Sequence, residues 1–122
     1  MRVIYLPQTH PMCMVEVDLD VKGDGSTLEP LQLLVGGRIE LVETPDYDVW
    51  INEEGLLHEQ FHVNMTASAL CGSLLVGPAV VTRAGPNGTT RGVTDRDLKR
   101  FRLTFESLGI VKSAKEAVDL VS

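Results

Sequence analysis

The stretch from residue 31 to residue 57 constrains the fold of this chain more than any other, because it holds several element boundaries. It reads LQLLVGGRIELVETPDYDVWINEEGLL. The paired glycines at 36 and 37 predict the end of a helix, since glycine readily takes the left-handed conformation found there. Strand-like runs follow at residues 39–42 and 48–51, with a Thr-Pro-Asp turn between them. The stretch therefore predicts a helix followed by two strands joined by a tight turn.

The helix that ends at the two glycines is predicted to span residues 27–35. Thr27 or Ser26 can cap its first turn, and Glu29 is placed to complete a capping box. Its apolar positions recur at the spacing of one helical face. We expect that face to be buried, with Leu28, Leu31, Leu34 and Val35 on it.

Three further strands are predicted from runs of branched and apolar residues, at residues 2–6, 12–19 and 74–82. The last of these is mainly apolar and is expected at the centre of the sheet. Asn64 can cap a short helix over residues 65–71. Residues 83–92, which hold three glycines and a proline, are expected to form an exposed loop.

A C-terminal helix is predicted to begin at the capping pair Thr94 and Asp97. Gly109 is expected to end it, and Ser113 is expected to start a last short helix. The apolar face of the longer helix consists of Leu98, Phe101, Phe105 and Leu108. The predicted fold is α+β, with a small antiparallel sheet, a helix packed on one face and a helical C-terminal segment. We expect one domain over residues 1–122, with a body of 1–92 and a helical tail of 93–122.

The chain length of 122 residues fits one hydrophobic core. Its two cysteines, Cys13 and Cys71, are far apart in sequence, which excludes a disulfide framework or a four-thiolate zinc site. Both lie in apolar runs, where inert thiols are commoner than nucleophiles. No signal peptide and no membrane-spanning run are evident. A cytoplasmic protein is therefore expected.

Charge is distributed unevenly along the chain, whose net charge is −6. Residues 1–90 carry 4 basic and 12 acidic side chains, whereas residues 91–122 carry 7 basic and 5 acidic ones. An acidic body of this kind disfavours non-specific binding to nucleic acid. We therefore expect partners other than nucleic acid or membrane.

The sequence HEQFH at residues 58–62 matches the His-Glu-x-x-His motif of zinc hydrolases. On a helix, His58 and His62 would bind the metal, and Glu59 would activate a metal-bound water. The context opposes this interpretation, since Gly55 and Asn64 leave room for barely two helical turns. Two solvated histidines are the simpler explanation, and zinc is kept as an alternative cofactor.

Candidate binding residues fall into a basic set and an acidic set. The basic set surrounds the apolar face of the C-terminal helix and could dock an acidic partner, a nucleotide phosphate or a second copy of the chain. A solvated outer face is the simpler explanation. The basic set is Arg91, Arg96, Lys99 and Arg100, and the acidic set lies at the turn of Asn52, Glu53 and Glu54.

The runs LQLLVGG, IE, DVWINEEGLL and LCGSLLVGPAVV, together with Asn64, resemble a family of small phage and mobile-element proteins, domain of unknown function 3846. The resemblance covers roughly residues 27–100. It implies a phage or prophage accessory protein with a small α+β fold, acting in the host cytoplasm. It carries over no catalytic residue.

Three functions follow from these observations. The first is a non-enzymatic phage accessory protein that binds a host protein, for defence evasion or host takeover. The second is a nucleotide or small-molecule binding protein that uses the basic helix. The third is a zinc-dependent hydrolase that uses His58, Glu59 and His62.

Overall fold

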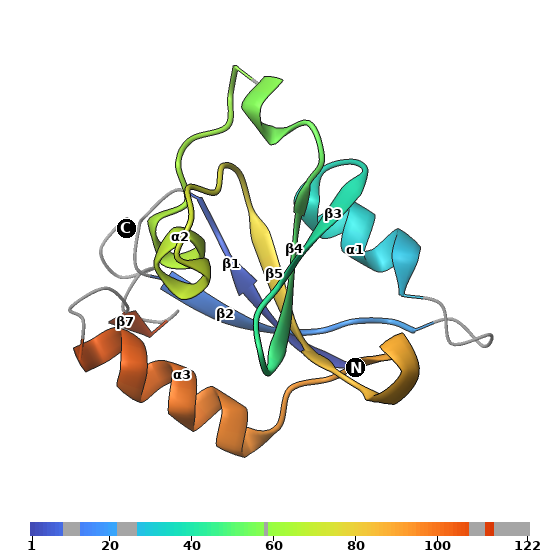
Figure 1. Ribbon diagram of the computed structural model, residues 1–122, viewed down its shortest axis with the longest axis vertical. Helices are drawn as coiled ribbons and strands as arrows, with labels where there is room; N and C mark the ends of the chain where they lie inside the picture. The colour runs from blue at the N-terminus through green and yellow to red at the C-terminus, as the bar shows by residue number, and fades with distance from the viewer. Residues whose placement is uncertain (9–12, 22–26, 58, 108–111, 114–122) are drawn as a thin grey trace.

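The computed structural model describes residues 1–8, 13–21, 27–57, 59–107 and 112–113 (Figure 1). Its strands are β1 (Arg2–Leu6), β2 (Cys13–Asp18), β3 (Ile39–Glu43), β4 (Tyr47–Asn52), β5 (Ala79–Ala84), β6 (Thr90–Arg91) and β7 (Lys112–Ser113). Its helices are α1 (Leu28–Val35), α2 (Met65–Cys71) and α3 (Asp95–Ser107), with the short 3-10 turns η1 (Gly55–Leu57) and η2 (Pro86–Gly88).

The strands form a sheet in the order β3-β4-β5-β1-β2-β7, with β6 paired to β5. Each described pairing is antiparallel except that of β7, which runs parallel to β2. The predicted α+β class, with an antiparallel sheet and a C-terminal helix, is thereby confirmed.

Helices cover both faces of the sheet (Figure 1). On one face, α1 contributes Leu31 and Val35 to a buried cluster with Val3 and Val80. On the other, α3 contributes Leu98 and Phe101 to a larger cluster that also takes in residues of α2. The Phe101 ring lies 4.5 Å from the Tyr47 ring, measured between centroids. The chain thus forms a helix–sheet–helix sandwich.

The strand at the centre of the sheet is β5, as expected, but it begins at Ala79 rather than at residue 74. Gly77 has a φ of +88°, which ends any extended run there, and Leu74 is exposed. From Ala79 to Thr82 every residue is buried, because both faces of β5 are covered.

The segment 83–92 is not the simple loop that its glycines predict. β5 runs on to Ala84, η2 makes a turn, and β6 returns to pair Arg91 with Arg83. The Gly85 amide donates to the Thr89 carbonyl at 2.8 Å and closes this hairpin. Glycine-rich composition predicted the turn but could not reveal the pairing on either side of it.

Helix ends follow the sequence closely. The Asn64 side chain accepts from the Ala67 amide, and Gly36 takes the left-handed conformation, both as predicted. Thr27 precedes α1 but makes no side-chain capping bond, and Leu28 is 49 % exposed rather than buried. Leu28 lies in the first turn of α1, whereas the buried residues of that helix, Leu31 and Val35, come later in it. At the C-terminal end, the helical tail predicted for 93–122 is wrong at Lys112–Ser113, which form a strand paired with β2. Leu108, Gly109 and residues 114–122 lie outside the described residues.

Candidate functional site

A buried carboxylate joins α3 to the sheet. Asp97 accepts the Tyr47 hydroxyl at 2.8 Å and the Thr94 amide at 2.9 Å, and one Arg83 nitrogen lies 2.8 and 3.0 Å from its two oxygens. Burial alone would raise the pKa of Asp97, but these hydrogen bonds outweigh it and hold the pKa below its usual value. The Asp97 carboxylate is therefore charged, fully hydrogen-bonded and structural in role.

A second polar residue, Asn64, is fully buried and fixes the start of α2. Its amide nitrogen donates to the carbonyls of Leu6 and Gly77 at 2.8 and 2.9 Å, and its oxygen caps Ala67. Asn64 thereby ties β1, α2 and the residues before β5 to one another. Its full set of hydrogen bonds gives it a structural role.

Asn52, which the sequence suggests for binding, makes structural hydrogen bonds and also lines the cavity beside Glu53 and Glu54. It is 3 % exposed, donates to the Val35 carbonyl at 3.1 Å and accepts from the Glu54 amide at 2.8 Å. It thereby fixes the end of α1 against the turn that follows β4. The side chains of Glu53 and Glu54 are exposed.

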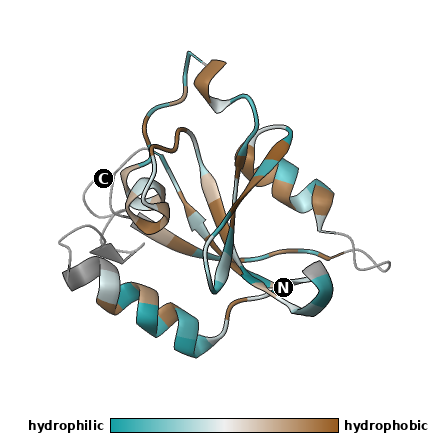
Figure 2. Cartoon of the chain, in the orientation of Figure 1, coloured by the Kyte–Doolittle hydropathy of each residue, from teal (hydrophilic) through white to brown (hydrophobic). Residues whose placement is uncertain are grey.

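The two glutamates border a cavity of about 450 Å³, which we call the leucine groove. It lies between β3, β4 and the connections on either side of α2. Leu56, Leu57 and Leu74 are 82, 80 and 70 % exposed, and η1 is drawn as a hydrophobic projection in Figure 2. The groove is lined by Glu40, Val42, Asn52, Glu53, Glu54, Leu56, Leu57 and Leu74, among others.

Charge in the leucine groove is of one sign. Glu40, Glu53 and Glu54 line it, and no lysine or arginine does. Within the described part of the chain, none of these three carboxylates forms an ion pair. The groove therefore combines exposed leucines with uncompensated negative charge, which suits a partner that is both apolar and basic.

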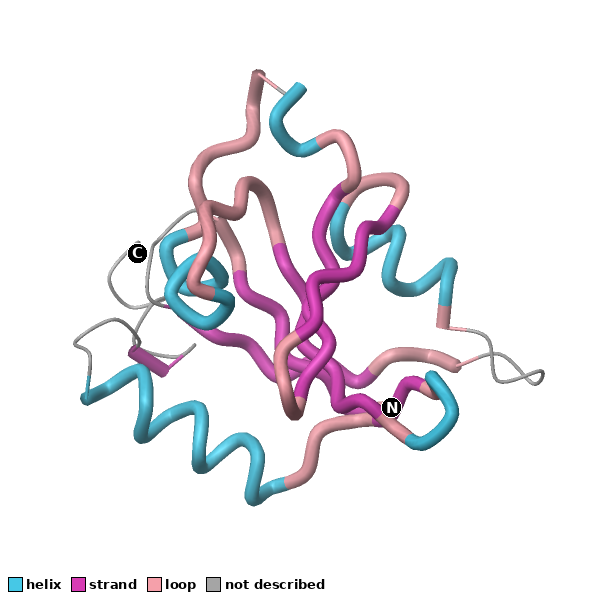
Figure 3. The backbone as a smooth tube through the Cα atoms, viewed as in Figure 1, coloured by secondary structure: helices cyan, strands magenta, loops and turns pink. Residues whose placement is uncertain are grey.

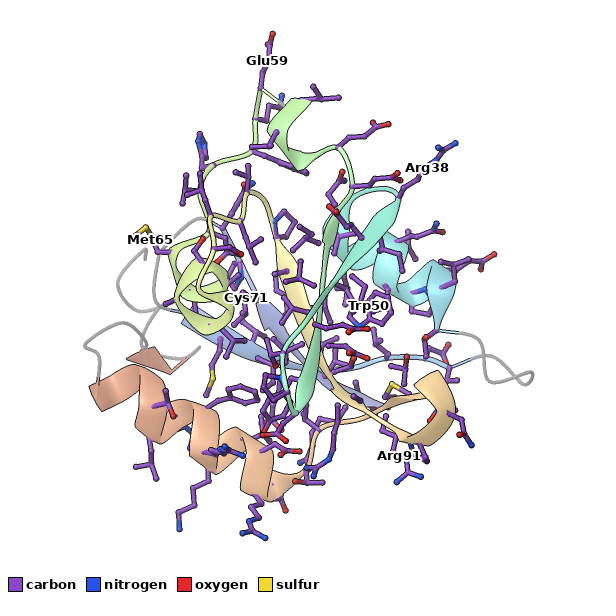
Figure 4. All side chains as sticks on the ribbon, viewed as in Figure 1. Arg38, Trp50, Glu59, Met65, Cys71 and Arg91 are labelled. Atoms are coloured by element: carbon purple, nitrogen blue, oxygen red, sulfur yellow. The ribbon has the colours of Figure 1, made fainter. Side chains whose placement is uncertain are left out.

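The predicted basic residues are only partly brought together. Arg96, Lys99 and Arg100 of α3 join Arg83 around a cavity of about 530 Å³, here called the basic hollow. Arg91 lies on β6 opposite Arg83 but does not line it (Figure 4). Arg83 is engaged by Asp97, and Arg100 lies 3.6 Å from Asp46 across an exposed pair.

The zinc interpretation of residues 58–62 needs a helix that the described residues do not form. Residues 59–62 are turn and coil between η1 and α2 (Figure 3). Glu59 points away from the body of the molecule (Figure 4), and the His62 amide donates to the Gln8 side chain at 2.7 Å. His58 lies outside the described residues, and among the rest no three His, Cys, Asp or Glu side chains are grouped to hold a metal. Zinc binding stays a prediction.

Cys71 is a free thiol at the end of α2. Its burial raises its pKa, which leaves little thiolate at neutral pH. This agrees with the inert thiol expected from its apolar surroundings. The side chain of Cys13 lies outside the described residues.

Comparison with known proteins gives a family. The family model described as a domain of unknown function (DUF3846) matches residues 1–106. The chain belongs to this family. The match extends beyond the 27–100 expected from the resemblance, and it takes in β1, β2 and nearly all of α3. No similar protein was found among curated proteins, and none among solved structures.

Of the residues that line the leucine groove, the sequence predicts Asn52, Glu53 and Glu54 for binding but neither Glu40 nor the leucines. Leu56 and Leu57 end the stretch of residues 31–57, but two adjacent leucines carry no periodicity that indicates exposure. The apolar run at 74–82 places Leu74 in a strand instead. The available signal was an apolar pair directly after an acidic turn, where a loop residue is ordinarily polar. In the described residues, no helix is long and apolar enough to cross a membrane.

Proposed function

We propose that this member of the DUF3846 family is a non-enzymatic binding protein whose partner docks on the leucine groove. The observation that supports this most is the gathering of Leu56, Leu57 and Leu74 around one cavity. Exposed leucines that share a cavity are characteristic of binding sites, whereas single exposed leucines are ordinary. By contrast, the buried polar side chains of Asn52, Asn64 and Asp97 make hydrogen bonds that hold the fold together.

The partner we propose is a host protein, and the chain acts as a phage or prophage accessory protein in the host cytoplasm. The resemblance to phage and mobile-element proteins supports this origin. Binding that blunts a defence system or redirects host physiology fits a small protein whose exposed leucines gather around one groove.

The test compares a double substitution in the groove with a single substitution of an exposed leucine elsewhere. Leu57→Asp with Leu74→Asp places charge in the groove, and Leu33→Asp makes the same kind of substitution on α1, where Leu33 is 84 % exposed. The wild type and Leu33→Asp should retain the same partner from a host lysate, identified by mass spectrometry. The double variant should lose it while keeping its unfolding midpoint. Retention of that partner by the double variant would refute docking at the groove.

A second candidate function is the binding of a nucleotide or another small anion in the basic hollow. Four cationic side chains line it, and the one carboxylate among the lining residues, Asp97, is already bonded to Arg83. Calorimetric titration with ATP and with inorganic phosphate tests this. Binding that weakens in Arg96→Glu with Arg100→Glu, and weakens further in high salt, would support it. Equal heats of binding for the wild type and the variant would contradict anion binding in the basic hollow.

A further inference from the structure

β3 lies at the outer edge of the sheet, and its pairing with β4 determines which of its backbone amides and carbonyls point outward. β3 pairs with β4 so that Ile39 opposes Asn52 and Leu41 opposes Trp50. At the two ends of this ladder, the Glu53 amide donates to the Arg38 carbonyl and the Thr44 amide donates to the Tyr47 carbonyl, both at 2.8 Å.

Hydrogen-bonded pairs alternate with non-bonded ones along an antiparallel ladder. Since residues 38 and 44 bond to β4, the even-numbered residues between them do so as well. The amides and carbonyls of Ile39, Leu41 and Glu43 therefore point away from β4. Within the described residues, no other strand pairs with this edge.

Native proteins commonly protect such an edge with proline, a bulge or a covering element. The sequence of β3, IELVE, contains no proline, and its register with β4 is continuous through five pairs. Its only charges are Glu40 and Glu43. Glu40 also forms the wall of the leucine groove, so a segment lying along this edge would run beside the groove.

We propose that an extended segment of the partner adds to the outer edge of β3 as a further strand, with apolar and basic side chains in alternation. This rests on the proposed function and specifies how the partner binds. Its hydrogen bonds would come from the backbone of Ile39, Leu41 and Glu43. Because side chains alternate between the two faces of a strand, its apolar ones would lie on the face of Glu40 and Val42, toward the leucines of the groove, and its basic ones would lie on the opposite face, beside Glu43 and Asp48.

Charge decides the chemistry of the added segment. Glu43 lies directly opposite Asp48 on a non-bonded pair, where side chains are close. Burial and then repulsion from Glu43 raise the pKa of Asp48, so negative charge at this corner is uncompensated. A second copy of β3 would bring more carboxylates to the same place. A basic segment relieves this repulsion, and a second copy increases it.

The probe is a seven-residue peptide of alternating lysine and valine, labelled for fluorescence anisotropy. Two forms carry N-methyl groups, one on the valine amides and one on the internal lysine amides, and a fourth peptide replaces lysine with glutamate. Strand addition uses alternate amides only. We expect one methylated form to bind within about threefold of the parent and the other at least about tenfold more weakly, since several hydrogen bonds are lost. The glutamate peptide should not bind.

The protein variants separate this inference from the proposed function. Glu43→Lys should weaken peptide binding, whereas Asp20→Lys, an equal charge change at an exposed position away from β3, should not. Equal binding of both methylated peptides, equal binding of the glutamate peptide, or no binding of the parent would overturn strand addition. So would a dimer in sedimentation that Leu41→Lys disrupts. None of these results alters whether Leu57→Asp with Leu74→Asp releases the host partner, which is the result that decides the proposed function.

Discussion

Arg83 and Asp97 connect the end of the central strand to the first turn of α3, with one guanidinium nitrogen within 3.0 Å of both carboxylate oxygens. Asp97 also completes the capping pair with Thr94, so a single carboxylate caps the helix and attaches it to the sheet. The pair therefore positions the basic face of α3.

Replacing this carboxylate should destabilise the fold. Asp97→Asn leaves Arg83 and the Tyr47 hydroxyl without their charged acceptor, and we expect a loss of about 2–4 kcal/mol in the free energy of unfolding. Urea denaturation measures it. Asp95→Asn is the matched control, because Asp95 is 93 % exposed and should leave stability close to that of the wild type. Equal stability of the two variants would contradict a structural role for Asp97.

The same carboxylate predicts a pH dependence. Because the pKa of Asp97 is lower in the folded state than its ordinary value, the unfolded state binds the proton more readily. Its contribution is complete above the ordinary aspartate pKa and is lost as the pH falls through the lower folded value. Wild-type stability should fall in acid, and Asp97→Asn should show a shallower fall. Parallel pH profiles for the two proteins would contradict this.

Asn64 offers a test that separates its two functions. Asn64→Ala removes the cap and both donated bonds, and should cost about 2–4 kcal/mol. Asn64→Asp keeps an oxygen for the Ala67 amide but turns negative oxygen toward the carbonyls of Leu6 and Gly77. Both variants should therefore unfold at lower urea concentration than the wild type. A stable Asn64→Asp protein would show that the donated bonds contribute little.

Two glycines with similar backbone angles differ in their surroundings. Gly77 has a φ of +88°, and an added Cβ would lie 2.9 Å from the Phe61 ring, whereas Gly72 has a φ of +70° and open space. Gly72→Ala should cost about 1 kcal/mol for the backbone alone, and Gly77→Ala should cost more because the ring must also move. Thermal unfolding of the two variants gives the difference. Equal losses would show that Phe61 accommodates the methyl group freely.

The buried face of α3 and its basic face should respond differently to substitution. Phe101 is 4 % exposed, so Phe101→Ala should cost about 3–5 kcal/mol. Arg96→Glu with Arg100→Glu should leave stability nearly unchanged, because the pair of Arg100 with Asp46 is exposed at both ends. Chemical denaturation measures both. A large loss in the arginine variant would mean that the basic face contributes to the fold.

The sequence predicted those elements whose signals are local. Gly36 and Asn64 mark helix ends by their own chemistry, and the spacing of Leu98 and Phe101 marks a buried face, which the structure confirms for these two. The prediction from sequence failed where the local structure depends on residues distant in the chain. The pairing of β6 with β5 and the burial of Asn52 depend on segments brought together only by the fold.

The candidate site was harder to predict for the same reason. The local acidic turn predicts Glu53 and Glu54, but Leu74 comes to the same groove from the other side of α2. The glycine-rich composition places Arg83 in a loop, yet it lies on β5 beside α3. Periodicity along the chain carries no information about contacts between residues that are distant in sequence.

The position of β5 has a consequence for how the chain acquires its structure. β1 with β2 and β3 with β4 are neighbours in sequence, so each antiparallel pair closes locally. Among the described strands, β5 joins the two pairs in the sheet, because Val81 opposes both Ile4 and Val49. During synthesis on the ribosome, we therefore expect the two pairs to join into one sheet only after β5 has emerged. Folding rate should then depend on closing the long connection from Ile4 to Val81, a distant contact of the kind that slows folding.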